Sequence, residues 1–324
     1  MPDLDQLTVR GWDLLRLATE TVQIDLVPAL GGTITSLVRR SDDAELLWTT
    51  PWALRHRGSL SVPGNAQASM IDDFPGGWFS MFPNGGDSAV LHGAEWGVHG
   101  EARLTWLDWE FTGSSLILTG RLIRSPFEFR KVVSLRGSEV TVGETVTNVG
   151  GERIEMMWAN QLMLGGALIG ADTTVDAAAS VVHPDPLISR GNDHHDILPW
   201  PRSYGAHSMI NLRSVPGPDS DETRAAYLTE FSEGSMTVRR PSRSLGLELS
   251  WDLEAWPHAW YALEAGGSSG FPWFGKAYYL AVTPSTSWPG HGVHDARRIA
   301  GSTVWMAPGA ALTTHLSAKV LSLD

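Results

Sequence analysis

The chain has 324 residues with 34 Gly, 19 Pro, 15 Trp and no Cys, and its formal net charge is -12. The absence of Cys excludes disulfides, thiolate metal sites and cysteine nucleophiles, and a cytoplasmic protein is the simplest interpretation. The negative charge, without a stripe of Lys and Arg, excludes nucleic acid as an expected partner.

Neither the start of the chain nor its most apolar stretch predicts a contact with a membrane. Residues 1–8 contain Asp3 and Asp5 and lack the basic and apolar regions of a secretory signal. The most apolar stretch, residues 156–171, is too short to span a bilayer and contains Asn160 and Gln161. We therefore expect a soluble protein with no membrane partner.

Short segments rich in β-branched and aromatic residues, separated by Gly, Pro, Asn and Asp, predict an antiparallel β protein. No helical periodicity persists beyond about three turns, and no internal repeat or domain boundary is visible, so residues 1–324 are expected to form one all-β domain. Gly120 is expected to be a turn between two short strands. In chain order the expected strands are 22–27, 33–38, 116–118, 121–123, 127–135, 140–149, 226–230, 234–238, 245–251, 260–263, 277–282 and 311–316.

Residues 184–218 differ from the rest because Pro and His are frequent there. Long ordered loops in compact proteins are often functional, so we expect an excursion over the surface. The pair His194 and His195, followed by Asp196, suggests a metal site, but adjacent His side chains on an extended loop point in different directions. A surface loop is the favoured interpretation, and no metal is expected.

Polar residues gather among Gly, Pro and Trp between residues 74 and 109. The glycines and prolines give an irregular backbone that can approach a ligand. Flat rings and polar groups together suit a polyhydroxylated ligand, although a well-packed loop would carry the same residues. The candidate donors and acceptors are Asn84, Asp87, His92, His99 and Glu101.

A second cluster, residues 251–273, places Glu264 at the end of an apolar strand, next to glycines and between Trp260 and Trp273. A carboxylate in that place either faces a cleft or meets water. No phosphate-binding Gly loop, G-x-S-x-G elbow or H-E-x-x-H helix is present. The residues alone therefore predict no specific reaction.

The order of several segments resembles the galactose mutarotase-like superfamily, and within it the aldose 1-epimerase family. The likeness extends from about residue 21 to 316. Its segments are Gly31 to Leu37, Phe82-Pro-Asn-Gly-Gly-Asp87, His99-Gly-Glu101, Met157-Trp158 leading to Gly165, Trp260 to Glu264, Pro272-Trp273, Thr283-Pro-Ser-Thr286 and Ala307-Pro-Gly-Ala310.

The resemblance implies one large β-sandwich, the supersandwich, with a cleft for a small-molecule carbohydrate across a concave sheet. It also implies interconversion of the α and β anomers of a free sugar without a cofactor. In that reaction a carboxylate takes the proton of the anomeric hydroxyl while an imidazole protonates the ring oxygen, which is general acid–base catalysis.

Residue by residue, His99 resembles the family's first His, which contacts the sugar, and His92 is a less well placed candidate. The family's second His lies in the strand after Met157-Trp158, where this chain has Trp-Ala-Asn-Gln and no His. The family's Glu base corresponds to Thr283. Neither Gln161 nor Thr283 can act as an acid or a base near neutral pH, so the resemblance predicts that the usual pair is lost.

Our leading hypothesis is therefore an isomerase with a displaced acid–base pair, Glu264 and His99, with His258 and the His194–His195 loop in reserve. A binding protein without catalysis is the first alternative. A lyase or hydrolase that uses Glu101 and Glu264 is the second. The identity of the sugar and a homodimer both stay open. Expected ligand contacts are Asn84, Asp87, His92, Glu101, Trp158, Gln161, Trp260, Trp273 and Thr283.

The tryptophans divide into two expected groups. Several of those in or beside the segments of the resemblance are expected at the cleft; this group is Trp78, Trp96, Trp106, Trp158, Trp260 and Trp273. A second group is expected to serve packing: Trp12, Trp48 and Trp305.

Overall fold

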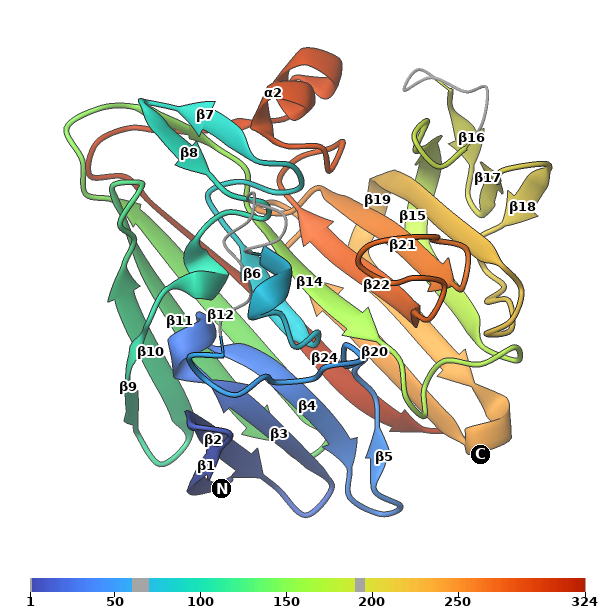
Figure 1. Cartoon of the computed structure of the whole chain (residues 1–324), viewed down its shortest axis with the longest axis horizontal. Coiled ribbons are helices and arrows are strands. Elements are labelled where there is room, and N and C mark those ends of the chain that lie inside the picture. The colour runs from blue at the N-terminus through green and yellow to red at the C-terminus, as the bar shows by residue number, and fades with distance from the viewer. Residues whose placement is uncertain (1, 60–69, 190–195, 324) are drawn as a thin grey trace.

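The computed structural model describes residues 2–59, 70–189 and 196–323, and in them the chain forms a large antiparallel sheet folded into two layers (Figure 1). The first layer follows the hydrogen-bonded order β1 (Asp3–Val9), β2 (Trp12–Ala18), β3 (Val22–Val27), β4 (Thr33–Arg39), β6 (Trp78–Met81), β14 (Ala159–Leu164), β22 (Tyr278–Ser285) and β21 (His258–Ala265). The second follows β9 (Asp108–Phe111), β10 (Ser115–Arg121), β11 (Phe127–Arg136), β12 (Glu139–Asn148), β24 (Ala311–Ser322) and β20 (Leu245–Trp251).

One long strand, β19 (Glu222–Arg240), belongs to both layers. Its first half pairs with β21 and its second half with β20. Between the halves, Glu230 has a positive φ of 53°, and β15 (Thr174–Pro184) follows β19 along both halves with a register shift between Ala177 and Ala179. Strand β19 therefore carries the sheet from one layer to the other.

The remaining elements are short and lie at the edges or in the connections. The strands are β5 (Ala44–Glu45), β7 (Ala89–Leu91), β8 (Ala94–Trp96), β13 (Ile154–Met156), β16 (Leu198–Pro199), β17 (Arg202–Tyr204), β18 (Met209–Asn211) and β23 (Val304–Met306). The helical turns are Pro28–Leu30, Ala102–Leu104, Pro241–Arg243, α2 (Val293–Asp295) and Ala296–Ala300. None of the helices in the described residues is long and apolar enough to cross a membrane.

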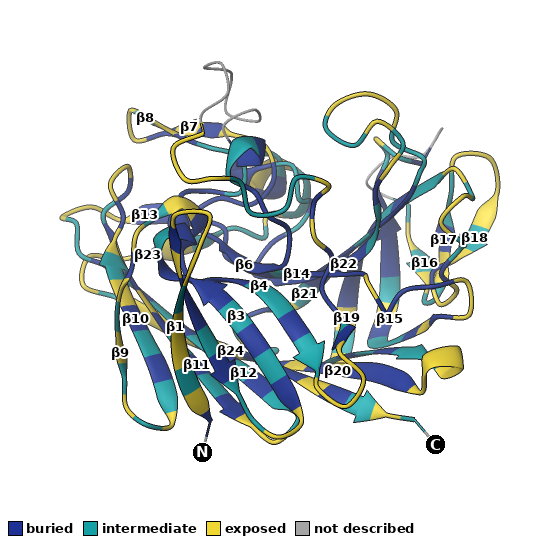
Figure 2. Ribbon diagram, turned by 60° about the horizontal axis from the view of Figure 1, so that its bottom comes forward, coloured by how far each residue is buried: buried dark blue, intermediate teal, exposed yellow. Residues whose placement is uncertain are grey.

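The core lies between the layers, and the strands that face it alternate buried and exposed positions (Figure 2). Strand β11 shows why: its apolar residues Phe127, Phe129 and Val133 point inward with the period of two that a pleated strand imposes. Phe82 packs edge-on against Phe127 and Trp158. The periodicity that predicted an all-β protein therefore arises from burial of one face of each strand.

Three details of the strand prediction were wrong or incomplete. Gly120 lies inside β10 and is not a turn. Glycine is required there by close packing, since a Cβ would lie 2.6 Å from the Leu107 side chain and 2.9 Å from the Trp106 carbonyl oxygen. Segments 226–230 and 234–238 are one strand, β19. Residues 184–218 contain the short β16, β17 and β18, while His194 and His195 lie outside the described residues.

A buried polar network connects the layers inside the core. The Glu144 carboxylate of β12 accepts hydrogen bonds from Asn160 Nδ2 (2.7 Å), Trp158 Nε1 (3.0 Å) and the Ser80 hydroxyl, and Lys131 Nζ lies 3.4 Å away. Both charged side chains are at most 2% exposed. Burial lowers the pKa of Lys131, and the Glu144 charge opposes that shift. The network therefore holds β6 and β14 of the first layer on β12 of the second.

We expect Lys131→Met to lower the free energy of unfolding by about 3–5 kcal/mol, because it leaves a buried carboxylate without its counter-ion. Urea unfolding followed by Trp fluorescence measures this. Lys319→Met is the matched control, since Lys319 is exposed on β24, and its effect is expected within about 0.5 kcal/mol. Equal effects of the two substitutions would contradict a structural role for the ion pair.

Candidate functional site

Six neighbouring strands, β6, β14, β22, β21, β19 and β15, place one residue each in a row on the face of the first layer that points away from the second layer. Cross-strand partners in a sheet share a face. The register pairs Phe79 with Gln161, Thr283 with Trp260, Trp260 with Tyr227, and Tyr227 with His183. We call these residues the outer row.

Gln161 and Thr283, which the resemblance aligns with the family's acid and base, lie side by side in the outer row. Thr283 Oγ1 donates to Gln161 Oε1 over 3.1 Å. Thr283 is 1% exposed and Gln161 is half-buried. The amide nitrogen of Gln161 has no hydrogen-bond partner among the described residues. The pair offers hydrogen bonds and no ionisable group.

His99 lies beside Phe79, the cross-strand neighbour of Gln161, with ring centroids 6.2 Å apart. The backbone N–H of Gly86 donates to His99 Nδ1 over 3.0 Å, which places the proton of the neutral ring on Nε2. Burial, aided by the Arg103 charge, lowers the pKa of His99 to about 3. At neutral pH His99 is therefore a hydrogen-bond donor and not a proton donor.

Glu264 is 3% exposed, and its carboxylate is engaged within its own loop. It accepts from Ser268 N (2.8 Å), the Ser268 hydroxyl and Thr223 Oγ1 (3.1 Å). These contacts anchor the start of the loop between β21 and β22. No hydrogen bond or ion pair joins Glu264 to His99 in the described part of the chain.

Two other expected ligand contacts are also engaged in loop structure. Asn84 is 0% exposed; its Oδ1 accepts from Val293 N and its Nδ2 donates to the Asp87 and Gly97 carbonyls. Glu101 accepts from the backbone N–H groups of 123 and 124 and from Ser125 Oγ. Their polar atoms are used to fix the loops, so the expectation that they contact a ligand is not supported.

The expected tryptophans do not all reach the outer row. Trp158 is wrong as a ligand contact, because its ring is 1% exposed in the core. Trp78 and Trp96 are also buried there, whereas Trp106 and Trp305 are 50% and 45% exposed, so packing is not the role of Trp305. Trp12 and Trp48 are packed as expected.

Two polar candidates lie outside the row. His92 follows β7, and its Nδ1 lies 3.6 Å from a Glu152 carboxylate oxygen on the surface. Asp87 is exposed, in the loop that follows β6.

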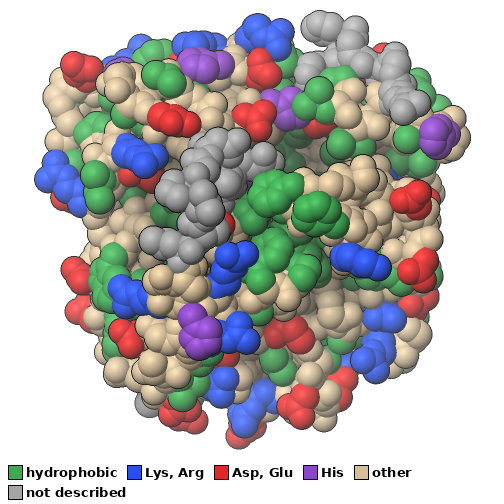
Figure 3. Space-filling view, in the orientation of Figure 1, with side chains coloured by type: hydrophobic (Ala, Val, Ile, Leu, Met, Phe, Trp, Pro, Cys, Tyr) green, Lys and Arg blue, Asp and Glu red, His purple; other side chains and the backbone are tan. Residues whose placement is uncertain are grey.

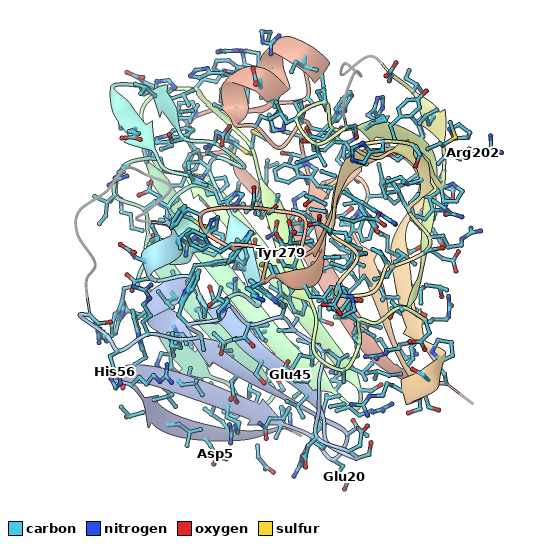
Figure 4. The ribbon with its side chains drawn as sticks, turned by 45° about the vertical axis from the view of Figure 1, so that its right-hand side comes forward. Asp5, Glu20, Glu45, His56, Arg202 and Tyr279 are labelled. Atoms are coloured by element: carbon cyan, nitrogen blue, oxygen red, sulfur yellow. The ribbon has the colours of Figure 1, made fainter. Side chains whose placement is uncertain are left out.

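An aromatic cluster borders the outer row. Trp273 stacks on Trp52 with ring centroids 5.8 Å apart and meets Trp48 edge-on at 5.1 Å. Tyr279 packs on Trp48 at 4.8 Å and lies near the middle of the molecule in Figure 4, whereas His56 lies at its periphery. Figure 3 shows hydrophobic side chains gathered near the centre of the same face as Figure 1.

Trp260 is 7% exposed because two glycine loops cover it. A Cβ on Gly85 would lie 2.8 Å from its ring, and one on Gly290 would lie 2.9 Å from it. Only glycine permits this approach. The second loop also carries His291.

A cluster that the sequence did not predict lies where this loop meets the outer row. The Tyr227 hydroxyl donates to Asp185 Oδ2 over 2.6 Å, and His291 Nε2 lies 2.8 Å from the same oxygen. The hydroxyl and His291 Nε2 are 3.1 Å apart. The other Asp185 oxygen accepts from Leu187 N. We call Asp185, Tyr227 and His291 the Asp–Tyr–His cluster.

The environment of the cluster favours its charged forms. Burial opposes ionisation of Asp185, but the hydrogen bonds and charge of His291 outweigh it, so the pKa of Asp185 is lowered. Burial likewise opposes protonation of His291, and Asp185 with Asp87 and Asp295 outweighs it, so the pKa of His291 is raised. The sequence feature that could have pointed to this cluster is His291, which lies between two glycines and follows Trp288-Pro289.

Two further histidines lie at the same end of the row. The His183 ring stacks on Trp288 with centroids 4.1 Å apart, and its Nε2 lies 3.1 Å from Thr229 Oγ1. Burial, aided by the charge of His183, lowers the pKa of His258 to about 4. Nδ1 of each ring is buried without a partner in the described residues. The described residues contain no group of three or more side chains that could hold a metal ion.

We expect the protein to lose stability as the pH falls from 6.5 towards 4. The pKa values of His99 and His258 lie below 6.5 in the folded state. At a pH between the folded-state pKa and the ordinary value of 6.5, the unfolded chain binds protons at these histidines that the folded chain does not bind. The free energy of unfolding therefore decreases on acidification. Each group contributes at most about 1.4 kcal/mol per pH unit.

His99→Asn tests this because an Asn oxygen can accept from Gly86 N without titrating. Unfolding curves between pH 7 and pH 5 are expected to show a shallower pH dependence than wild type. His56→Asn is the control, since His56 is exposed. A slope unchanged by His99→Asn would show that His99 protonates freely in the folded protein.

Comparisons with known proteins give the fold. No protein-family model matches the sequence, and no curated protein matches it. Among solved structures, a galactose mutarotase-like protein from Lactobacillus casei has a TM-score of 0.65 at 16% identity, with 95% of this chain and 99% of that one covered. A galactose mutarotase-like protein from Clostridium acetobutylicum has a TM-score of 0.66 at 10% identity, covering 99% of each chain.

A third structure is a Klebsiella pneumoniae protein whose assignment as an aldose 1-epimerase is provisional. It has a TM-score of 0.75 at 12% identity and covers 99% of this chain and 83% of its own. These likenesses extend over almost the whole described chain. The two-layered antiparallel sheet of this protein therefore has the galactose mutarotase-like fold, as the order of its sequence segments predicted.

Proposed function

We propose that the protein binds a carbohydrate over the outer row, and that sugar recognition is its primary function. The observation that carries this proposal is the hydrogen bond between Gln161 and Thr283, the two residues that the resemblance aligns with the family's acid and base. An amide nitrogen beside a hydroxyl suits a sugar hydroxyl, which both donates and accepts.

Neighbouring groups support the same ligand class. The Nε2–H of His99 adds a neutral donor beside the pair. The rings of Trp273, Trp52 and Tyr279 add apolar surface at the border of the row, and such sites combine flat rings with a few polar groups. The side chains combine the polar and apolar contacts that a sugar requires.

Anomer interconversion is the second candidate function, and one observation favours it. Gln161 and Thr283 cannot transfer protons, and the Glu264 carboxylate is engaged by Ser268 and Thr223. The Asp–Tyr–His cluster, however, supplies ionisable groups in the same outer row. Hydrolysis by Glu101 and Glu264 has less support, because hydrogen bonds within loops engage both carboxylates.

We expect Gln161→Ala to weaken sugar binding about tenfold, which corresponds to the loss of one neutral hydrogen bond of about 1.4 kcal/mol. Titration calorimetry with D-glucose, D-galactose, D-mannose and their 6-phosphates measures the dissociation constants. Gln6→Ala is the matched control, because Gln6 is exposed on β1, far from the row in sequence and in the sheet.

The two variants separate sugar binding from general effects on the protein. If no sugar of this panel binds to the wild type, the proposed function is wrong. If a sugar binds and both variants bind it as tightly as wild type, the ligand lies elsewhere than at the Gln161–Thr283 pair.

A further inference from the structure

We infer that the Asp–Tyr–His cluster is an acid–base centre that transfers protons to and from a bound sugar. This inference rests on the proposed function, since it needs a carbohydrate on the outer row. It assigns chemistry to residues other than the family's pair and other than Glu264 and His99.

The first step of the argument is the geometry of the three side chains. Asp185 directly follows β15, Tyr227 lies on its partner strand β19, and His291 comes from the loop over Trp260. All three pairwise contacts lie between 2.6 and 3.1 Å. An Asp that accepts from one ring nitrogen orients a His and stabilises its charged form. The second ring nitrogen then becomes the one that exchanges protons.

The second step is the burial of the cluster. The Asp185 side chain is 6% exposed, and that of His291 is 13% exposed. All three side chains are largely buried, and the imidazole is the most exposed of them. The ring of Trp288 lies 5.9 Å from that of Tyr227 and covers His183, so it adds an apolar wall beside the cluster.

The third step is the charge around His291. Asp185 and Asp87 face it from other segments, and Asp295 faces it from its own segment; all three favour the imidazolium. Among the other titratable groups beside the cluster, Tyr227 has a pKa raised well above its usual value by burial and by Asp185. The charges around the centre therefore favour an imidazolium at His291 and a carboxylate at Asp185, and burial favours a neutral phenol at Tyr227.

These groups can open and close a sugar ring with balanced protons. The imidazolium of His291 gives a proton to the ring oxygen while the bond from that oxygen to C1 breaks. The anomeric hydroxyl gives its proton to the Tyr227 oxygen, Tyr227 passes its own proton to Asp185, and the electron pair of the O–H bond forms the C1 carbonyl. After rotation about C1–C2, the reverse proton transfers close the ring to give the other anomer. Asp185, Tyr227 and His291 then return to their starting protonation states.

The test measures anomer exchange and sugar binding on the same full-length protein. Exchange of α- and β-D-glucose, D-galactose and D-mannose and their 6-phosphates is followed by NMR against the buffer rate, and binding by calorimetry. We expect wild type to accelerate exchange of at least one sugar. Asp185→Asn and His291→Ala are expected to lose at least 100-fold of that acceleration, within the range of general acid–base catalysis.

Controls separate catalysis from folding. His315→Gln, on the exposed side of β24, is expected to retain the wild-type rate. Added imidazole is expected to restore part of the rate of His291→Ala, which a purely structural defect would not allow. Tyr227→Phe removes the proton relay and is expected to slow exchange without abolishing binding.

The outcomes distinguish this inference from the function on which it rests. Binding without exchange above the buffer rate overturns the acid–base centre and leaves sugar recognition intact. Exchange that persists in His291→Ala and Asp185→Asn also overturns it. Absence of both binding and exchange in wild type overturns the proposed function together with this inference.

Discussion

The arrangement of the outer row depends on a buried carboxylate on the opposite layer. Glu144 accepts from Asn160 and Trp158, the residues that flank Ala159 at the start of β14. Successive side chains of a strand point to opposite faces, so a shift of one residue would exchange Asn160 and Gln161. Such a shift would bury Gln161 and turn Asn160 away from Glu144. The core network thus selects the register that brings Gln161 next to Thr283.

Two loops then convert that sheet face into a site. Gly86 and Gly290 approach so closely that a Cβ on Gly86 would lie 1.9 Å from the Gly290 carbonyl oxygen. Asn84 ties the first loop to Val293, just after the second. Because the loops support each other, they hold Gly86, which donates to His99, and Gly290, which precedes His291, in fixed positions. The backbone contacts, more than the polar side chains of these segments, define the shape of the site.

The sequence was sufficient to predict the all-β fold, since alternation in strands such as β11 and β12 is a local signal. The resemblance aligned Gln161 and Thr283 with the family's acid and base, and the structure shows that these two residues are in contact. The sequence could not show that Glu264 is engaged by Ser268, because that depends on the conformation of a loop. The Asp185–Tyr227–His291 contacts join three distant segments, and no spacing along the chain encodes them.

The long strand β19 has a consequence for the way the molecule comes apart. Its first half is hydrogen-bonded to β21 and its second half to β20, so one continuous backbone is shared by both layers. Separation of either layer from the rest of the molecule would break backbone hydrogen bonds of β19. The two layers are thereby joined into one cooperative unit, in which a ligand held at Tyr227 would also protect amides of the opposite layer from exchange with solvent.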